Sequence, residues 1–161
     1  MKRLIGLLAL LIVISINANA QYKTGFGLRG GFSQGLTVKH FFNENTAING
    51  QLSSRGSEGA FVITALLNKH ATWNELFQVN KGDLTWFYGY GGHLGAYGKL
   101  TENPYDGLGG GFDGSLGMEY AFEQIPFSIA LDYRLIFDVG FETKQHKIFQ
   151  DPAFSIRYTI K

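Results

Sequence analysis

The sequence predicts an all-β fold, an eight-stranded antiparallel up-and-down barrel. Past residue 20, apolar residues recur at every second position, which is the period of a β-strand with two different faces. Eight such stretches are separated by segments rich in turn residues such as glycine, asparagine and proline. A convincing helical period is absent past residue 20, where residues 73–77 are the only short candidate for a helix.

The composition is that of an ordered chain with few charges. Its 161 residues are 45% hydrophobic, 15% aromatic and 17% charged, with 22 glycines and 3 prolines. An average soluble domain has about 25% charged residues and about 7% glycine. The many aromatic residues argue against disorder, and the few prolines exclude collagen. Because the chain has no cysteine, disulfide frameworks, thiolate zinc sites and cysteine nucleophiles are excluded.

The first twenty residues have the three parts of a secretory signal peptide. These are a positive start, an uncharged run and an A-x-A cleavage site, at Lys2-Arg3, residues 4–16 and Ala18-Asn19-Ala20. A membrane anchor would need about 20 apolar residues, and Asn17 and Asn19 shorten the run. We expect residues 1–20 to be a signal peptide and 21–161 to be one domain. That domain has 12 basic and 13 acidic residues, which leaves no basic surface for nucleic acid.

The predicted strands follow in chain order, each with one apolar face. In the first four strands this face holds Phe26, Leu28 and Phe32, then Leu36 and Val38, then Ile48 and Leu52, then Phe61, Ile63 and Leu67. In the next two it holds Leu84, Trp86, Tyr88, Tyr90 and Leu94, then Phe112, Leu116, Met118, Tyr120 and Phe122. The seventh strand is the clearest, because all six odd positions of 127–137 are apolar or aromatic. The eighth has Phe154, Ile156, Tyr158 and Ile160.

Two residues do not follow the alternation, and seven segments are expected to connect the strands. His40 lies on the apolar side of its strand, and Phe87 lies on the polar side. The expected connections are 33–35, 43–45, 55–59, 71–83, 99–110, 123–126 and 138–152. Of the three connections expected on the periplasmic side, 43–45 and 123–126 are short, whereas 71–83 is long.

Periodicity alone leaves open which face points inward. In a soluble secreted ligand-binding β-barrel the apolar face lines the interior, whereas in an outer-membrane barrel it faces lipid. Here the polar face is rich in small residues with isolated charges, unlike a solvated surface, and aromatic residues gather towards the strand ends. We therefore expect a transmembrane β-barrel and keep the soluble barrel as the alternative. Its interior polar network would comprise Arg29, Lys39, His93, Glu119, Asp132, Arg134 and Arg157.

Several segments also resemble a known group of proteins. These are the signal peptide, 25–31, 36–40, 86–93 and 154–160, which look like small outer-membrane β-barrel proteins of Bacteroidetes type, similar in architecture to OmpA- and OmpX-type eight-stranded barrels. The resemblance implies a Gram-negative cell outer membrane, contact with its lipid and with the barrel assembly machinery, and a largely unassigned role. Such barrels usually end on an aromatic residue, whereas this chain ends Tyr158-Thr159-Ile160-Lys161.

Motifs for catalysis, cofactors or metals are not found. The sequence has no G-x-S-x-G elbow for a serine nucleophile, and its four histidines show no spacing of two or four residues. The glycine-rich 88–93 lies within a predicted strand and lacks a following G-K-[ST]. We expect a monomeric, non-catalytic protein without cofactor or metal, with a structural or surface-interaction role. The alternatives are a lipid-modifying barrel enzyme using His93 and a gated path for small ions. An extracellular ligand, if there is one, is expected to meet the loops 99–110 and 138–151.

Overall fold

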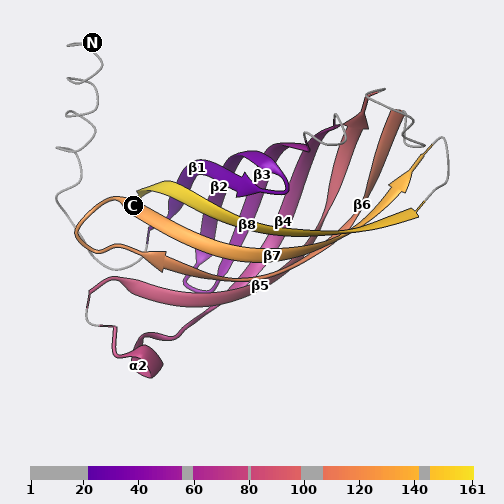
Figure 1. Ribbon diagram of the computed structural model, residues 1–161. Coiled ribbons are helices and arrows are strands. Elements are labelled where there is room, and N and C mark those ends of the chain that lie inside the picture. Colours follow the sequence, from indigo (N-terminus) through magenta and orange to yellow (C-terminus); the bar gives the residue numbers. More distant parts are fainter. Residues whose placement is uncertain (1–21, 56–59, 80, 99–106, 142–145) are drawn as a thin grey trace, which may run out of the picture.

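The computed structural model describes residues 22–55, 60–79, 81–98, 107–141 and 146–161 (Figure 1). The predicted signal peptide lies outside these residues. Among the described residues, none of the helical structure is long and apolar enough to cross a membrane.

Eight strands form one closed antiparallel barrel in chain order, and β8 closes it by pairing with β1. The prediction of an all-β, eight-stranded up-and-down barrel is confirmed. The strands are β1 (Thr24–Gly31), β2 (Gln34–Asn43), β3 (Thr46–Arg55), β4 (Ala60–Thr72), β5 (Asp83–Tyr97), β6 (Gly107–Ala121), β7 (Phe127–Gly140) and β8 (His146–Ile160). The short helix α2 (Asn74–Phe77) lies between β4 and β5, which confirms the single helical candidate.

The stagger of the strands determines the width of the barrel. One row of paired residues runs around it through Gly27, Thr37, Gln51, Thr64, His93, Gly111, Asp138 and Lys147. Gly27 itself pairs with Arg157 of β8, which lies ten positions beyond Lys147. For strands about 4.8 Å apart that rise about 3.3 Å per residue, this stagger gives a tilt of about 41° and a backbone radius of roughly 8 Å. Such an interior is just wide enough for side chains.

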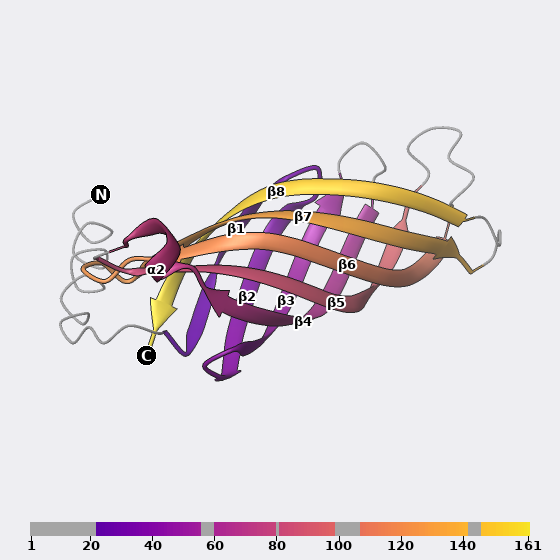
Figure 2. The same cartoon turned by 90° about the horizontal axis from the view of Figure 1, so that it is seen from below.

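The two ends of the barrel differ. The C-terminus and α2 lie at one end, which we call the terminal end (Figures 1 and 2). The opposite end, which we call the far end, carries the β1–β2, β3–β4, β5–β6 and β7–β8 connections. The strands β5 to β8 have 14 or 15 residues each, whereas β1 to β3 have 8 to 10. The barrel wall is therefore taller on the side of β5 to β8.

Three predicted connections at the far end were too long. Arg55 belongs to β3, β6 begins at Gly107, and β7 and β8 extend to Gly140 and from His146. The residues there pair in regular register, but His146, Gln150 and Pro152 occupy outward positions of β8 and interrupt the apolar alternation that defined the predicted strands. Pairing between backbone groups continues as long as a neighbouring strand offers partners, whatever the side chains are.

The apolar face of every strand points away from the barrel interior. Phe112 is 79% exposed and Leu28 is 61% exposed, although both are large hydrophobic residues. Among the outward-facing strand positions that the structure describes, Lys69 is the one residue of the Asp, Glu, Lys and Arg types. His40 also lies on this outer face, partly exposed and next to Phe42. The molecule is thus apolar outside and polar inside, the reverse of a soluble barrel.

Candidate functional site

The barrel interior is filled with paired charges. All seven residues that the sequence placed in the interior network are buried there. Counted over the described residues, the buried ionisable side chains are five cations and five carboxylates besides His70 and His93: Arg29, Lys39, Arg55, Arg134 and Arg157 with Asp113, Glu119, Asp132, Asp138 and Asp151. A buried charge is costly unless it is paired and hydrogen-bonded. The equal numbers make the interior electrically neutral when both histidines are neutral.

At the terminal end, Glu119 is the centre of the first cluster. The Tyr22 hydroxyl and the Lys39 ammonium both donate short hydrogen bonds to its carboxylate, and the Arg157 guanidinium lies 3.7 Å away. Arg157 also donates to the hydroxyl of Thr37 at 3.4 Å. Burial and the neighbouring Glu119 raise the pKa of the Tyr22 phenol, so it stays protonated and donates. One carboxylate on β6 therefore holds cations from two strands, β2 and β8, and a hydroxyl from the segment before β1.

A row of four aromatic rings lies next to this cluster. Tyr22 packs edge-on against Phe41 with ring centroids 5.2 Å apart, and Phe41 lies 4.9 Å from His70. The His70 ring stacks on Phe87 at 5.0 Å, and the Lys39 ammonium lies 4.4 Å from the Phe87 centroid. The inward position of Phe87 that the sequence predicted is explained by these contacts, because its face meets a cation.

The second cluster lies in the middle of the barrel. Arg29 donates two hydrogen bonds of 2.7 Å to Asp132 and a third of 3.2 Å to Asp151. Asp151 also accepts from Arg134 at 2.6 Å and from the backbone and hydroxyl of Ser33 at 3.1 and 2.7 Å. Two carboxylates and two guanidiniums thus form one chain of charge-assisted bonds, which are stronger than neutral ones.

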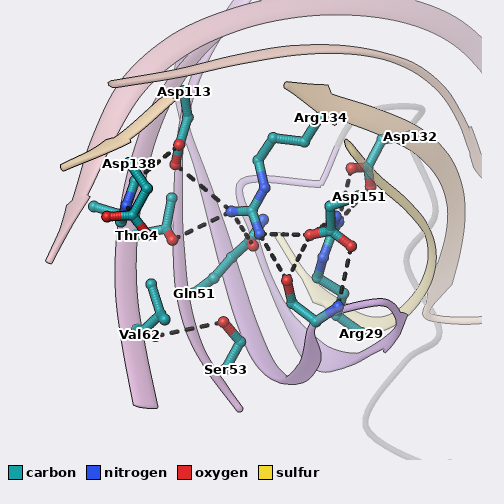
Figure 3. Close-up of polar contacts among 12 residues, drawn as sticks. Arg29, Gln51, Ser53, Val62, Thr64, Asp113, Asp132, Arg134, Asp138 and Asp151 are labelled. Carbon is teal, nitrogen blue, oxygen red and sulfur yellow. Dashed lines mark hydrogen bonds and ion pairs between the residues drawn. The ribbon is translucent and has the colours of Figure 1, made fainter. Parts of the chain in front are cut away.

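Arg134 reaches across the barrel from β7 (Figure 3). Its guanidinium donates to Gln51 at 3.0 Å and to Thr64 at 3.2 Å, on β3 and β4. It also lies 3.9 Å from Asp113 of β6. This one side chain therefore ties together strands from opposite walls of the barrel.

The third cluster lies towards the far end, around His93. Its Nδ1 atom is 2.9 Å from Asp113 and its Nε2 atom is 3.5 Å from Asp138. Asp138 also pairs with Arg55 at 3.3 Å and accepts a short hydrogen bond from the Tyr97 hydroxyl. His93 therefore lies between a carboxylate of β6 and a carboxylate of β7.

Small residues make room for these side chains. A Cβ atom at Gly89 would lie 2.3 Å from the Asn68 amide oxygen and 2.8 Å from the Ser115 hydroxyl. A Cβ atom at Gly117 would lie 2.6 Å from the Phe87 ring. The high glycine content of the chain is therefore in part a packing requirement of its narrow interior.

The contacts of His93 differ from those of a hydrolase base. Both ring nitrogens of His93 face carboxylates, so neither is placed to take a proton from a serine hydroxyl, as a hydrolase base must. In the part of the chain that the structure describes, no group of three histidine or acidic side chains is arranged to hold a metal ion.

Sequence reasoning missed four charged members of the interior network. Asp113 lies on the predicted polar face of its strand but was not assigned to the network. Arg55, Asp138 and Asp151 were assigned to connections, whereas they lie in β3, β7 and β8 with side chains at most 1% exposed. For Asp138 and Asp151 the available signal was their parity relative to Arg134 and Arg157, because alternate residues on a strand share a face.

These features define a class of protein: a closed eight-stranded barrel with a charge-filled interior and an apolar outer face. In comparisons with known proteins, the chain matches no protein family, no curated protein and no solved structure.

Proposed function

We propose that this protein is a monomeric β-barrel of a Gram-negative outer membrane, with a structural or surface-interaction role and without catalysis. The main support for the proposal is the distribution of polar and apolar side chains. Large hydrophobic side chains are exposed around the outside, while the ten buried charged side chains described above lie inside. In water this distribution would leave apolar surface far larger than soluble monomers tolerate. In lipid it is what stabilises a barrel, because closure also leaves no unpaired strand edge.

The height of the apolar surface supports the same proposal. On β7 the outward-facing residues from Phe127 to Phe137 are all apolar or aromatic. The ten steps between these two residues, at about 3.3 Å each and tilted by about 41°, rise about 25 Å, which equals the height of the apolar band of outer-membrane barrels. In this proposal the terminal end faces the periplasm and the far end faces the outside.

The same observations weigh against a soluble ligand-binding barrel. Such a barrel would turn its apolar face inward to line a pocket, whereas here that face is outward and the interior is occupied by Arg134 and its partners. Outer-membrane lipid is the expected partner of the outer face, and the barrel assembly machinery is the expected partner during insertion.

Cell fractionation with gel mobility tests the proposal. We expect the protein in the outer-membrane fraction, with an electrophoretic mobility that differs between unheated and boiled samples because a closed barrel resists detergent until heated. Recovery in the soluble periplasm, with the same mobility before and after boiling, would contradict it.

A further inference from the structure

The connection between β4 and β5 at the terminal end forms a hydrogen-bonded turn around Asn74. The Asn74 side-chain oxygen accepts from the Leu84 backbone at 2.7 Å, and its amide donates to Asp83 at 2.8 Å. The backbone of Trp73 bonds to Leu84 at 2.8 Å, and the backbone of Val79 bonds to Asn74 at 2.9 Å. The three bonds to Asp83 and Leu84 hold the turn against the start of β5, and the fourth lies within the turn itself.

This turn carries exposed apolar side chains. Leu76 is 71% exposed and Phe77 is 57% exposed. Phe77 lies 5.6 Å from Trp73, Trp73 lies 6.1 Å from Trp86, and Trp86 lies 5.9 Å from Tyr88, measured between ring centroids. The four rings form an aromatic ladder that runs from α2 onto the outer face of β5.

We propose that α2 and this ladder lie in the headgroup layer of the bilayer, so that the connection acts as an interfacial anchor at the terminal end. The inference rests on the proposed membrane location. Tryptophan and tyrosine favour this layer because their rings are apolar at one end and polar at the other. The ladder is continuous with the apolar outer face, so the same lipid that covers β5 would reach α2.

The position of Lys69 agrees with this boundary. Among the outward-facing strand positions that the structure describes, it is the one residue of the Asp, Glu, Lys and Arg types. Lys69 pairs in register with Tyr88, and Ala71 pairs with Trp86. Lys69 therefore lies beside the ladder, at the level where a long cationic side chain can extend to lipid phosphates. The exposed Glu75 lies in α2 and the exposed Lys81 follows it, as expected where the turn meets water.

The chain offers an internal reporter for the test, because Trp73 and Trp86 are its two tryptophans. In W86F the fluorescence comes from Trp73, and in W73F it comes from Trp86. Each variant is inserted into phosphatidylcholine vesicles that contain spin-labelled lipids with the quenching group either near the headgroup or deep in the acyl chain. A heat-dependent gel mobility shift verifies that each variant is folded.

We expect the shallow quencher to reduce Trp73 emission at least twofold more than the deep quencher. Replacing both apolar residues of α2 in the W86F background, as L76N with F77N, should shift Trp73 emission to longer wavelength and reduce its quenching. E75Q in the same background is the matched control and should change neither.

Two other outcomes have distinct meanings. If Trp86 is quenched but Trp73 is quenched by neither lipid, the inference is wrong while the barrel is still in the membrane, and α2 faces water or a protein partner. If neither tryptophan is quenched, the proposed membrane location itself is wrong.

Discussion

At the scale of single residues, the interior is stabilised by carboxylates that each hold several donors. Glu119 and Asp151 accept from more than one element, including Tyr22 before β1 and Ser33 between β1 and β2. Removing one partner of such a group leaves the other charges buried without compensation. Single substitutions here should therefore cost more than the loss of one surface ion pair.

Glu119→Ala should lower the free energy of unfolding by about 3–5 kcal/mol, because Lys39 and Arg157 would lose their buried carboxylate partner. Denaturant unfolding of the barrel in vesicles measures this. Glu123→Ala, at an exposed position between β6 and β7, is the matched control and should change stability by less than about 0.5 kcal/mol. Equal stability of the two variants would mean that Glu119 is in solvent.

Gly117→Ala should also destabilise the barrel, by about 1–3 kcal/mol, because overpacking forces neighbouring groups to move. Its new Cβ would lie 2.6 Å from both the Leu131 carbonyl oxygen and the Phe87 ring. Gly114→Ala is the control, since nothing lies within 4 Å of its Cβ position. The same unfolding measurement compares them, and a tolerated Gly117→Ala would show that the interior can relax around Phe87.

At the scale of elements, each strand presents one face to the barrel interior and the other face to the outside. On β7 the even-numbered positions, which include Ser128, Asp132, Arg134 and Asp138, point inward, and the apolar or aromatic residues at the odd-numbered positions point outward. A change of one residue in register would exchange the two faces completely. Substitutions on the outer face of a strand therefore test whether lipid or water surrounds the barrel.

Leu131→Arg should impair insertion into lipid vesicles, because an arginine at the midplane of a bilayer costs about 2–4 kcal/mol. Leu131 is 57% exposed on the outer face. Val139→Arg, near the far end of the same strand, is the control and should cost about 0–1 kcal/mol, since the penalty falls towards the membrane surface. The folded fraction is read from the heat-dependent gel mobility. Improved solubility and unchanged folding of Leu131→Arg in buffer would indicate that this face contacts water.

At the scale of the whole molecule, the stagger and the strand number leave a narrow interior that the three clusters occupy. The bonds among Arg29, Asp132, Asp151 and Arg134 join the adjacent strands β1, β7 and β8, and Arg134 also donates across the interior to Gln51 and Thr64 on the opposite wall (Figure 3). Breaking them together to open a path would expose several buried charges at once. The narrow, occupied interior thus favours a stable closed barrel rather than a path for solutes.

The purified barrel should accordingly show no steady ion conductance in planar bilayers under an applied voltage, because eight strands enclose side chains rather than an aqueous channel. Single-channel recording tests this at moderate voltage, with a known open porin as the positive control for bilayer quality. Reproducible stepwise openings would instead support the gated ion path.

The sequence by itself determined the fold class, the number of strands and the two faces of each strand. It could do so because the pleat of a strand alternates side chains locally, without reference to any neighbour. The low charge and small residues of the polar face also placed seven charges in the interior. Strand ends at the far end escaped prediction, since backbone pairing with a neighbour extends strands beyond the apolar pattern, as at Arg55 and Asp151.

Only the tertiary structure decided which charges meet. Tyr22 and Glu119 are 97 residues apart in the chain, and Arg29 and Asp151 are 122 apart. Closing the barrel with a stagger of ten residues brings each pair to the same height. That stagger depends on the register of all eight strand pairs together, and no local pattern specifies it. The sequence therefore determined that the interior would be charged, and barrel closure decided how its charges are paired.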